Sequence, residues 1–288
     1  MTAATRPRRS VLYMPGSNAR AMEKAQTLPA DALILDLEDA VAPDAKLAAR
    51  ALVCEAVKAR GFGKREVIVR INALSTVWGQ DDLAAAADAK PDAILVPKVS
   101  AGRDLCEIEA RMPAADLAIW AMIETPIALF NLAEIAGVGG RLACFVMGTN
   151  DLIKEFRGAH TADRQNLSAA LSLSVAAARS FGLSVIDGVY SDINNTDGFY
   201  ATCCQGRAFG FDGKTLIHPS QIEPCNDIFA PAPDEVEAAR KIIAAFEKPE
   251  NRGKGAIALD GRMVELLHAE IARRTVALAD AIAALEDR

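Results

Sequence analysis

Two acidic residues, Glu124 and Asp151, each follow a distinctly apolar stretch of the chain. Glu124 comes directly after LAIWAMI, and Asp151 ends the segment FVMGTND. An unpaired charge at a buried position costs several kcal/mol, so such charges persist only when they are paired, hydrogen-bonded or bound to a cation. The alternative for any one of them is a strand end that simply meets solvent. Because both acids follow apolar runs, we interpret them as candidate metal ligands.

The residue types available around these acids favour a hard, oxygen-seeking ion. The three histidines are not paired at metal-ligand spacing, and the six cysteines form no CxxC motif. Two carboxylates without histidine or cysteine suit Mg²⁺ better than Zn²⁺. Mg²⁺ takes few protein ligands and keeps coordination positions open for water or substrate oxygens. A substrate that carries a carboxylate beside a hydroxyl or keto group would complete its coordination.

Arg70 ends the run EVIVR and is a candidate for binding a substrate anion. A guanidinium is always charged and presents a fork of donors, so it can hold a carboxylate or a developing enolate oxygen. The alternative is a salt bridge with Glu38 or Glu124. We assign no catalytic role to three other ionisable residues at the ends of apolar runs: Lys98, Asp187 and His218.

The segment YMPGSNARAMEK predicts a tight turn followed by the start of a helix, with Ser17 or Asn18 as the cap. Free backbone donors at this turn, together with the side chains of Arg20 and Lys24, form a candidate seat for a phosphate group.

Eight short apolar segments, many rich in β-branched residues, alternate with alanine-rich amphipathic segments such as ARAMEKAQTL and IALFNLAEIAGV. This alternation predicts an α/β fold, a parallel TIM (β/α)8 barrel, whose active site lies where the C-terminal ends of the strands converge. An open doubly wound sheet is the alternative, but no GxGxxG motif follows the first strand. The expected strands are SVLYMPG, DALILDLED, EVIVRIN, AILVPK, LAIWAMIET, LACFVMGTND, SVIDG and KTLIH.

The chain continues well beyond the last expected strand. We assign residues 1–225 to the barrel and residues 226–288 to a small helical appendage, a candidate lid. In this appendage, DEVEAARKIIAAFEKPEN predicts a helix that ends at Lys248-Pro249, and NRGKGAIALDG predicts a glycine-rich mobile loop. RMVELLHAEIARRTVALADAIAAL predicts a second helix.

Composition excludes several classes of function. The net charge of -6 offers no basic stripe for nucleic acid, so we expect no such partner. The basic N-terminal segment MTAATRPRRS lacks the apolar region of a secretory signal, and no uncharged apolar run approaches the roughly 18 to 20 residues that span a bilayer. Six sparse cysteines fit reduced thiols. We therefore expect a cytoplasmic protein that acts on small molecules.

With Arg70, Glu124 and Asp151 placed, the sequence resembles the citrate lyase beta-subunit-like family. These proteins are relatives of malyl-CoA lyases and malyl-CoA thioesterase within the HpcH/HpaI aldolase/citrate lyase superfamily. The resemblance covers nearly the whole chain, and the matching blocks occur in the family's order. These blocks are RSVLYMPG, DALILDLEDAVAPDAK, VRIN, PKV, IETP, GTNDL, GKTLIHPSQI and GAIALDGRMV.

The resemblance implies a homotrimeric or homohexameric enzyme that uses Mg²⁺, or Mn²⁺, on a thioester of coenzyme A. By position, Glu124 and Asp151 match the metal ligands, and Arg70 matches the substrate-binding arginine. The resemblance also implies roles for further residues. Asp260 matches a lid aspartate brought to a neighbouring subunit's site, Glu38 and Asp39 match an acidic pair that supports the metal's waters and Arg70, and Pro15, Gly16, Arg20 and Lys24 match the coenzyme A channel.

The main functional hypothesis is cleavage, or condensation, of a 3-hydroxy-carboxyacyl-CoA such as malyl-, methylmalyl-, citramalyl- or citryl-CoA. Its products would be an acyl-CoA and a 2-oxo acid. Arg70 would stabilise the thioester enolate, and Asp260 would act as general acid or base. The second hypothesis is a (3S)-malyl-CoA thioesterase, which forms malate and coenzyme A. The motif GTNDL and the short chain resemble thioesterase-like members more than the longer lyases.

Two further hypotheses stay open. The chain could be the beta subunit of a citrate lyase complex that acts on an acyl-carrier thioester, in which case it would show little activity alone. It could also be a metal-dependent aldolase for free 2-oxo acids, which would not need the Asp260 lid.

Overall fold

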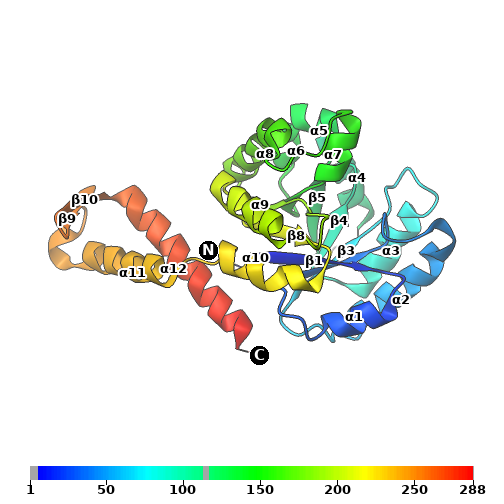
Figure 1. Ribbon diagram of the computed structural model, residues 1–288, viewed down its shortest axis with the longest axis horizontal. Coiled ribbons are helices and arrows are strands. Elements are labelled where there is room, and N and C mark those ends of the chain that lie inside the picture. Colours follow the sequence, from blue (N-terminus) through cyan, green and yellow to red (C-terminus); the bar gives the residue numbers. More distant parts are fainter. Residues whose placement is uncertain (1–5, 113–116, 288) are drawn as a thin grey trace. The chain divides into compact units, whose positions relative to one another are not determined.

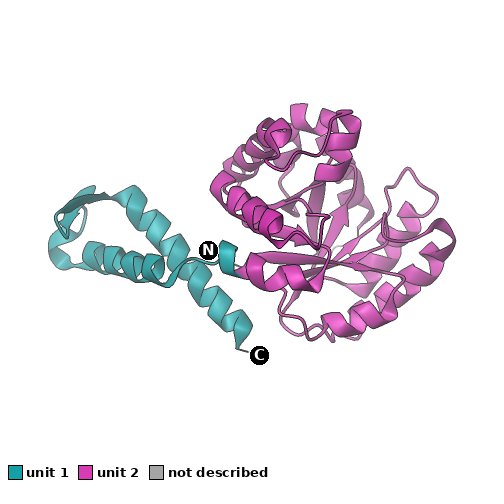
Figure 2. Cartoon of the chain, in the orientation of Figure 1, with its two compact units in different colours: residues 1–7, 227–288 teal, residues 8–226 magenta. Residues whose placement is uncertain are grey.

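The structure is a computed structural model that describes residues 6–112 and 117–287, so the basic N-terminal segment is described only from Arg6 onwards. The described chain divides into two compact units (Figure 2). Residues 8–226 form one unit, and residues 227–287 form the other together with residues 6 and 7.

Eight parallel strands close into a barrel in chain order, and β8 pairs with β1 (Figure 1). This confirms the predicted (β/α)8 barrel. Strands such as ALILD and EVIVR are buried along their whole length, as expected for parallel strands that are covered on both faces. The strands are β1 (Ser10–Pro15), β2 (Ala32–Asp36), β3 (Glu66–Arg70), β4 (Ala93–Val96), β5 (Ala118–Ile123), β6 (Leu142–Met147), β7 (Ser184–Asp187) and β8 (Gly213–Leu216).

Helices connect the strands and surround the barrel (Figure 1). The last of them, α10, crosses the boundary between the two units. The helices are α1 (Ala19–Ala25), α2 (Lys46–Lys58), α3 (Gly79–Ala89), α4 (Gly102–Arg111), α5 (Pro126–Phe130), α6 (Leu132–Ala136), α7 (Thr149–Glu155), α8 (Ser168–Ser180), α9 (Thr196–Phe209) and α10 (Ile222–Phe229), with short 3₁₀ turns η1 (Pro43–Ala45), η2 (Gln165–Leu167) and η3 (Pro219–Gln221).

Two segments of the barrel unit differ from the sequence predictions. IALFNLAEIAGV forms two short helices instead of one, because Asn131 leaves helical geometry and its side chain donates to the Ser100 carbonyl. Asp151 does not end a strand: β6 stops at Met147, and Asp151 lies in the first turn of α7.

The inward-facing side chains of the strands form the core of the barrel. This cluster includes Ile34, Ile68, Trp120 and Met122, all buried. Because side chains on a strand alternate between its two faces, the residues two positions further along point the same way. An apolar interior therefore leads directly into a charged layer at the C-terminal ends of the strands.

The smaller unit contains α11 (Pro233–Glu247), η4 (Pro249–Asn251), β9 (Ala256–Leu259), β10 (Arg262–Glu265) and α12 (Leu266–Glu286). The predicted glycine-rich loop is wrong, because β9 and β10 pair as an antiparallel hairpin. Asp260 and Gly261 both have positive φ, as a two-residue type I′ turn requires. The predicted second helix accordingly begins at Leu266. An Asp-Gly pair between apolar residues is a hairpin signal that the sequence did contain.

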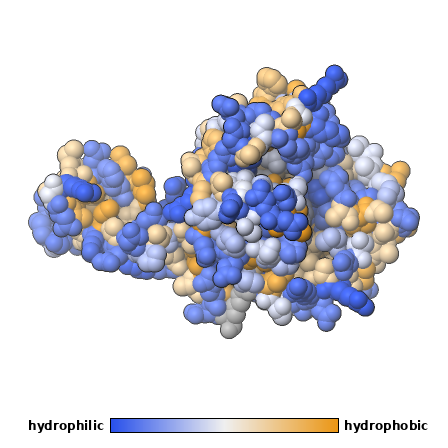
Figure 3. Space-filling view, viewed as in Figure 1, coloured by the Kyte–Doolittle hydropathy of each residue, from blue (hydrophilic) through white to orange (hydrophobic). Residues whose placement is uncertain are grey.

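The hairpin has a small core of its own, in which Ile257 and Val264 pack with Phe246. Other large apolar side chains of this unit are exposed, and Figure 3 shows hydrophobic surface between its hydrophilic residues. They are Met263, Leu266, Leu267 and Ile271. None of the described helices combines the length and the apolar character needed to cross a membrane.

Candidate active site

A cavity of about 300 Å³ opens at the C-terminal end of the barrel. Its wall combines ionisable groups with apolar side chains from several strands and from α7. The lining residues are Tyr13, Asp36, Asp39, Ala40, Arg70, Met122, Glu124, Met147, Gly148, Thr149, Asn150, Asp151, Val189, Thr215 and Ile217.

Strand register explains why charged residues from distant parts of the sequence meet here. Asp36 lies two residues after Ile34, and Arg70 lies two residues after Ile68. Asp36 and Arg70 are also direct partners in the pairing of β2 with β3. Glu124 follows the interior residue Met122 by the same step of two. Each of these groups therefore points into the barrel from a neighbouring position.

Arg70 is held by several carboxylates. Its Nε and Nη2 donate to the two oxygens of Asp36, both at 2.7 Å. Its Nη1 lies 2.9 Å from Glu38 Oε2 and 3.4 Å from Asp39 Oδ2. The guanidinium also lies over the ring of Tyr13, 4.9 Å from the centroid. Although burial opposes it, Tyr13, Asp36 and Glu38 raise the pKa of Arg70, so the group is a fixed, permanent cation.

Glu124 is 1% exposed, and its Oε1 accepts a hydrogen bond of 2.7 Å from the Lys98 backbone N–H. Its other oxygen, Oε2, is buried and has no hydrogen-bond partner among the described residues. A Cβ at position 148 would collide with this carboxylate, so Gly148 leaves the space that Glu124 occupies. Burial raises the pKa of Glu124, and Lys98 opposes the rise. A buried acceptor without a partner is unfavourable unless a cation or donor joins it.

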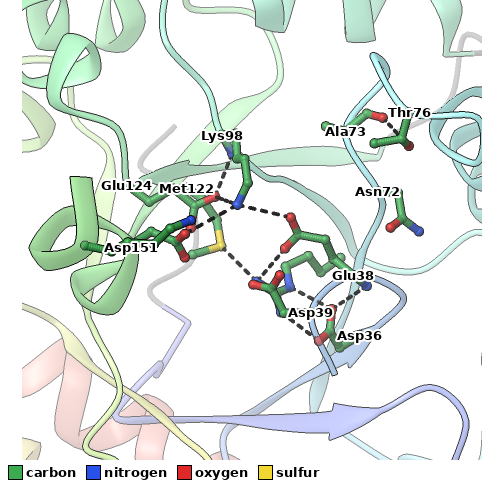
Figure 4. A network of polar contacts seen from close by, with 12 residues as sticks. Asp36, Glu38, Asp39, Asn72, Ala73, Thr76, Lys98, Met122, Glu124 and Asp151 are labelled. Atoms are coloured by element: carbon green, nitrogen blue, oxygen red, sulfur yellow. Dashed lines mark hydrogen bonds and ion pairs between the residues drawn. The ribbon is translucent and has the colours of Figure 1, made fainter. Parts of the chain in front are cut away.

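Asp151 reaches the same space from α7. The ammonium of Lys98 lies 3.6 Å from Asp151 Oδ1, 3.9 Å from Glu124 Oε1 and 3.5 Å from Glu38 Oε1 (Figure 4). Glu38 follows β2, Glu124 follows β5 and Asp151 lies in α7, and all three acids face one nitrogen. Burial raises the pKa of Glu38 to about 7, and Asp39 and Glu124 add to the rise while Arg70 opposes it.

The geometry fits a divalent cation bound by Glu124 and Asp151. The cavity is rich in carboxylates, and Glu124 Oε2 has no hydrogen-bond partner in the described part of the chain. No cluster of three or more candidate ligands occurs among the described residues. Mg²⁺ does not require such a cluster, because it is usually held by one or two carboxylates and completes its octahedron with water and substrate oxygens.

The sequence-predicted residues separate into three groups. Asp39, Arg70, Glu124 and Asp151 line the cavity, and Glu38 contacts both Arg70 and Lys98. The predicted coenzyme A residues lie at the end of β1 and on α1, outside the cavity lining: Pro15 and the buried Gly16 are at the turn, and Arg20 and Lys24 are exposed. Asp260 lies in the smaller unit, at the tip of the hairpin.

Sequence reasoning missed several residues of the site. The sequence predicts no role for Asp36, which lies in the expected strand DALILDLED, although Asp36 makes the shortest contact to Arg70. Asp36 could have been found from its pairing with Arg70 on the neighbouring strand, because both side chains point into the barrel. Tyr13 and Met122 were read as plain strand residues. The Tyr13 hydroxyl contacts the Met122 sulfur at 3.6 Å, and burial raises the pKa of Tyr13. The sequence predicts no role for Lys98, because the position of Lys98 among three acids depends on the tertiary fold.

A second ionic cluster lies on the outer side of β7 and β8. Asp187 Oδ2 accepts from Lys214 Nζ at 2.8 Å, and both side chains are fully buried. Arg164 Nη1 donates to both oxygens of Asp187, at 2.8 and 2.9 Å. Although burial opposes it, Lys214 and Arg164 lower the pKa of Asp187.

Comparisons with known proteins agree on one family. The family model described as HpcH/HpaI aldolase/citrate lyase matches residues 9–219. The chain is 51% identical over 284 residues to a (3S)-malyl-CoA thioesterase of Cereibacter sphaeroides, covering 99% of each protein. It is 36% identical over 270 residues to citrate lyase subunit beta of Escherichia coli, covering 91% of this chain and 89% of the relative.

A solved structure of CitE from Mycobacterium tuberculosis, in complex with magnesium, acetoacetate and coenzyme A, matches with a TM-score of 0.74 and 30% identity. The match covers 93% of this chain and 97% of the CitE chain.

Proposed function

The chain belongs to the HpcH/HpaI aldolase/citrate lyase family, and from this premise we propose that it hydrolyses (3S)-malyl-CoA to malate and coenzyme A. The observation that carries the proposal is the identity of 51% with a (3S)-malyl-CoA thioesterase over the full length of both proteins. This favours the second hypothesis from the sequence, hydrolysis, over the first, which was carbon–carbon cleavage.

Glu124 and Asp151 would hold Mg²⁺, or Mn²⁺, at the bottom of the cavity. The partnerless oxygen of Glu124 and the magnesium in the related CitE structure support this assignment. A divalent ion bound there would act as a Lewis acid on the oxygens of the malyl group. Glu38 and Asp39 would hold waters around it and keep Arg70 in place.

Arg70 would stabilise the negative charge that develops on the thioester oxygen when water attacks the carbonyl carbon. Its fixed position supports this role, because Asp36 locks two of its three nitrogens and no reorganisation is needed during the reaction. The carbon–sulfur bond then breaks, and the sulfur leaves as the thiolate of coenzyme A. The water gives up one proton to a general base, for which Asp260 is the candidate.

Asp260 would reach the site of a neighbouring subunit in a homotrimer or homohexamer, with residues 226–288 acting as the lid. Asp260 is exposed at the tip of a two-residue turn, which supports this role. The exposed apolar residues Met263, Leu266, Leu267 and Ile271 support docking of this unit against another chain.

The coenzyme A portion of the substrate would lie along the turn after β1. Arg20 and Lys24 are exposed and stand four residues apart on one face of α1, which suits contact with the phosphates of coenzyme A. Pro15 and Gly16 would shape the turn. Gly16 packs too closely against the Asp36 carbonyl to carry a side chain.

Carbon–carbon cleavage is the second candidate, because the family includes lyases and the citrate lyase subunit beta of Escherichia coli is 36% identical. In that reaction the same Arg70 would stabilise a thioester enolate, and an acyl-CoA and a 2-oxo acid would be released. A role as one subunit of a citrate lyase complex would require partner proteins and an acyl-carrier thioester.

The test is product analysis with the purified protein, MgCl₂ and malyl-CoA. Hydrolysis gives malate and free thiol in equal amounts, whereas cleavage gives glyoxylate and acetyl-CoA. Methylmalyl-, citramalyl- and citryl-CoA extend the panel to the other acyl groups. Glyoxylate without malate would reject the thioesterase. Light scattering distinguishes a self-contained oligomer that is active alone from a subunit that needs partners. Asp260→Ala should abolish turnover without preventing assembly.

A further inference from the structure

Lys98 has an unusual backbone conformation beside the active-site cavity. It follows β4, and its φ of 54° places it in the left-handed region, which residues other than glycine rarely adopt. Such strain persists where the surrounding structure fixes it, and it clusters at functional sites. In this conformation the Lys98 backbone N–H donates to Glu124 Oε1. The main chain of Lys98 therefore positions one candidate metal ligand.

The side chain of Lys98 points into the same group of acids. Its ammonium lies between 3.5 and 3.9 Å from the carboxylates of Glu38, Glu124 and Asp151. No one of these contacts has the length of a short hydrogen bond, so the nitrogen is held by the summed charge and not by any single partner. Figure 4 shows the side chain extending between these acids.

Arg70, which lines the cavity, is already bound to Asp36 and Glu38. Lys98 is therefore the described cation that faces both Glu124 and Asp151. Its side chain is 44% exposed, in contrast to the 7% of Arg70, so it is free to move into solvent. A flexible, strongly hydrated ammonium is suited to such exchange.

We propose that Lys98 is the internal counter-ion of the metal site. Its ammonium lies among the three carboxylates when no divalent ion is bound, and it withdraws to solvent when the ion enters. The backbone N–H of Lys98 holds Glu124 in both states. Lys98 is thus a positioning residue that lowers the affinity for the metal while it stabilises the metal-free site. This proposal rests on the proposed function, because it takes Glu124 and Asp151 to be the metal ligands.

The experiment is calorimetric titration of the full-length protein with MgCl₂, without substrate, at low ionic strength. Lys98→Met removes the charge and keeps a side chain of similar length. We expect Lys98→Met to bind Mg²⁺ at least about fivefold more tightly than the wild type. This factor corresponds to about 1 kcal/mol, the interaction of two unit charges about 4 Å apart in a medium as polar as water. Lys98→Arg should stay close to the wild type. Lys58→Met is the matched control, because Lys58 pairs with Asp88 on the surface of α2 and α3.

Thermal unfolding gives a second measurement. Without metal, Lys98→Met should unfold at a lower temperature than the wild type, because three carboxylates lose their shared cation. Saturating MgCl₂ should raise its midpoint by more than it raises that of the wild type. Should Lys98→Met fold poorly, crystals of the wild type grown with and without MgCl₂ provide the test: an ammonium still among the carboxylates beside bound Mg²⁺ would overturn the proposal.

The outcomes separate the two proposals. Mg²⁺ binding by the wild type with equal or weaker binding by Lys98→Met would overturn the counter-ion and leave the metal site intact. Absence of Mg²⁺ binding by both proteins would reject the metal site itself.

Discussion

The barrel unit carries two ionic clusters that differ in charge balance and in closure. Among the described residues in and beside the cavity, five carboxylates surround two cations: Asp36, Glu38, Asp39, Glu124 and Asp151 face Arg70 and Lys98. On the outer side of β7 and β8 the balance is reversed, because Asp187 faces both Lys214 and Arg164.

The two clusters also differ in their contacts with solvent. Asp187 and Lys214 are fully buried, and each oxygen of Asp187 has a short contact. At the cavity, Glu124 keeps one oxygen without a hydrogen-bond partner among the residues that the structure describes, and the neighbouring Lys98 is partly exposed. A closed cluster with all its groups paired stabilises the fold. An open cluster with excess negative charge has a place for a cation from outside, and this difference favours the open cluster as the candidate functional site.

The largest expected effect comes from neutralising the acids of the open cluster. Glu124→Gln and Asp151→Asn should each lower kcat/KM by more than about 100-fold, since even indirect support of a metal commonly contributes 10- to 100-fold. Steady-state kinetics with malyl-CoA measures the effect. The unfolding midpoint without metal should not fall, because each substitution removes excess negative charge. Turnover within tenfold of the wild type would contradict the metal site.

Opening the closed cluster should affect stability instead of chemistry. Lys214→Met leaves Asp187 buried with one partner fewer, and the free energy of unfolding should fall by about 3 kcal/mol. Arg164 still pairs with Asp187, so the loss should stay at the lower end of the range for broken buried pairs. Urea unfolding measures it. We expect kcat of the folded fraction to stay near the wild-type value, and a loss below about 1 kcal/mol would show that the pair is not structural.

The pH dependence of stability should reveal the charge excess of the open cluster. The pKa of Glu38 rises from 4.5 to about 7 in the folded protein. Because its pKa is raised, the folded protein binds the proton of Glu38 more tightly than the unfolded chain does. Protonation of Glu38 therefore stabilises the fold fully below pH 4.5, and this stabilisation is lost as the pH rises through 7. The midpoint of the metal-free protein should therefore fall relative to Glu38→Gln over this window. If the unfolding midpoints of the wild type and Glu38→Gln changed in parallel with pH, the raised pKa of Glu38 would be contradicted.

The smallest effect is expected at an exposed ion pair. Arg240 and Asp280 lie 2.6 Å apart, but both side chains are more than half exposed. Arg240→Met should change the free energy of unfolding by at most about 1 kcal/mol, because solvent and salt screen such pairs. Urea unfolding beside Lys214→Met gives the direct contrast. If Arg240→Met lost as much free energy of unfolding as Lys214→Met, burial would not explain why the two ion pairs differ in their contribution to stability.

The barrel could be predicted from the sequence because its signals are local. Runs such as ALIL and EVIV alternate with amphipathic helices, and every one of the eight expected strands occurs in the structure. Where a local signal was misread, the prediction failed. The sequence pattern predicts a loop at Asp260-Gly261, although both residues suit a hairpin, and it predicts a strand that runs past Gly148 into what is α7.

The candidate site was predicted only in part. Residue type and position after an apolar run identified Arg70, Glu124 and Asp151. The bidentate bond from Asp36 to Arg70 depends on the register of β2 against β3, which no single strand contains. The place of Lys98 depends on three segments that meet only after the barrel closes. It also depends on a left-handed backbone conformation that the sequence does not predict.

By itself, the sequence determined the order of strands and helices and the presence of charges at the strand ends, because periodicity and hydrophobic burial act over a few neighbouring residues. Only the tertiary structure decided which charges are satisfied by one another and which remain open to a cation. That decision depends on distances of 3 to 4 Å between groups far apart in the chain, where Coulomb energy and desolvation change steeply.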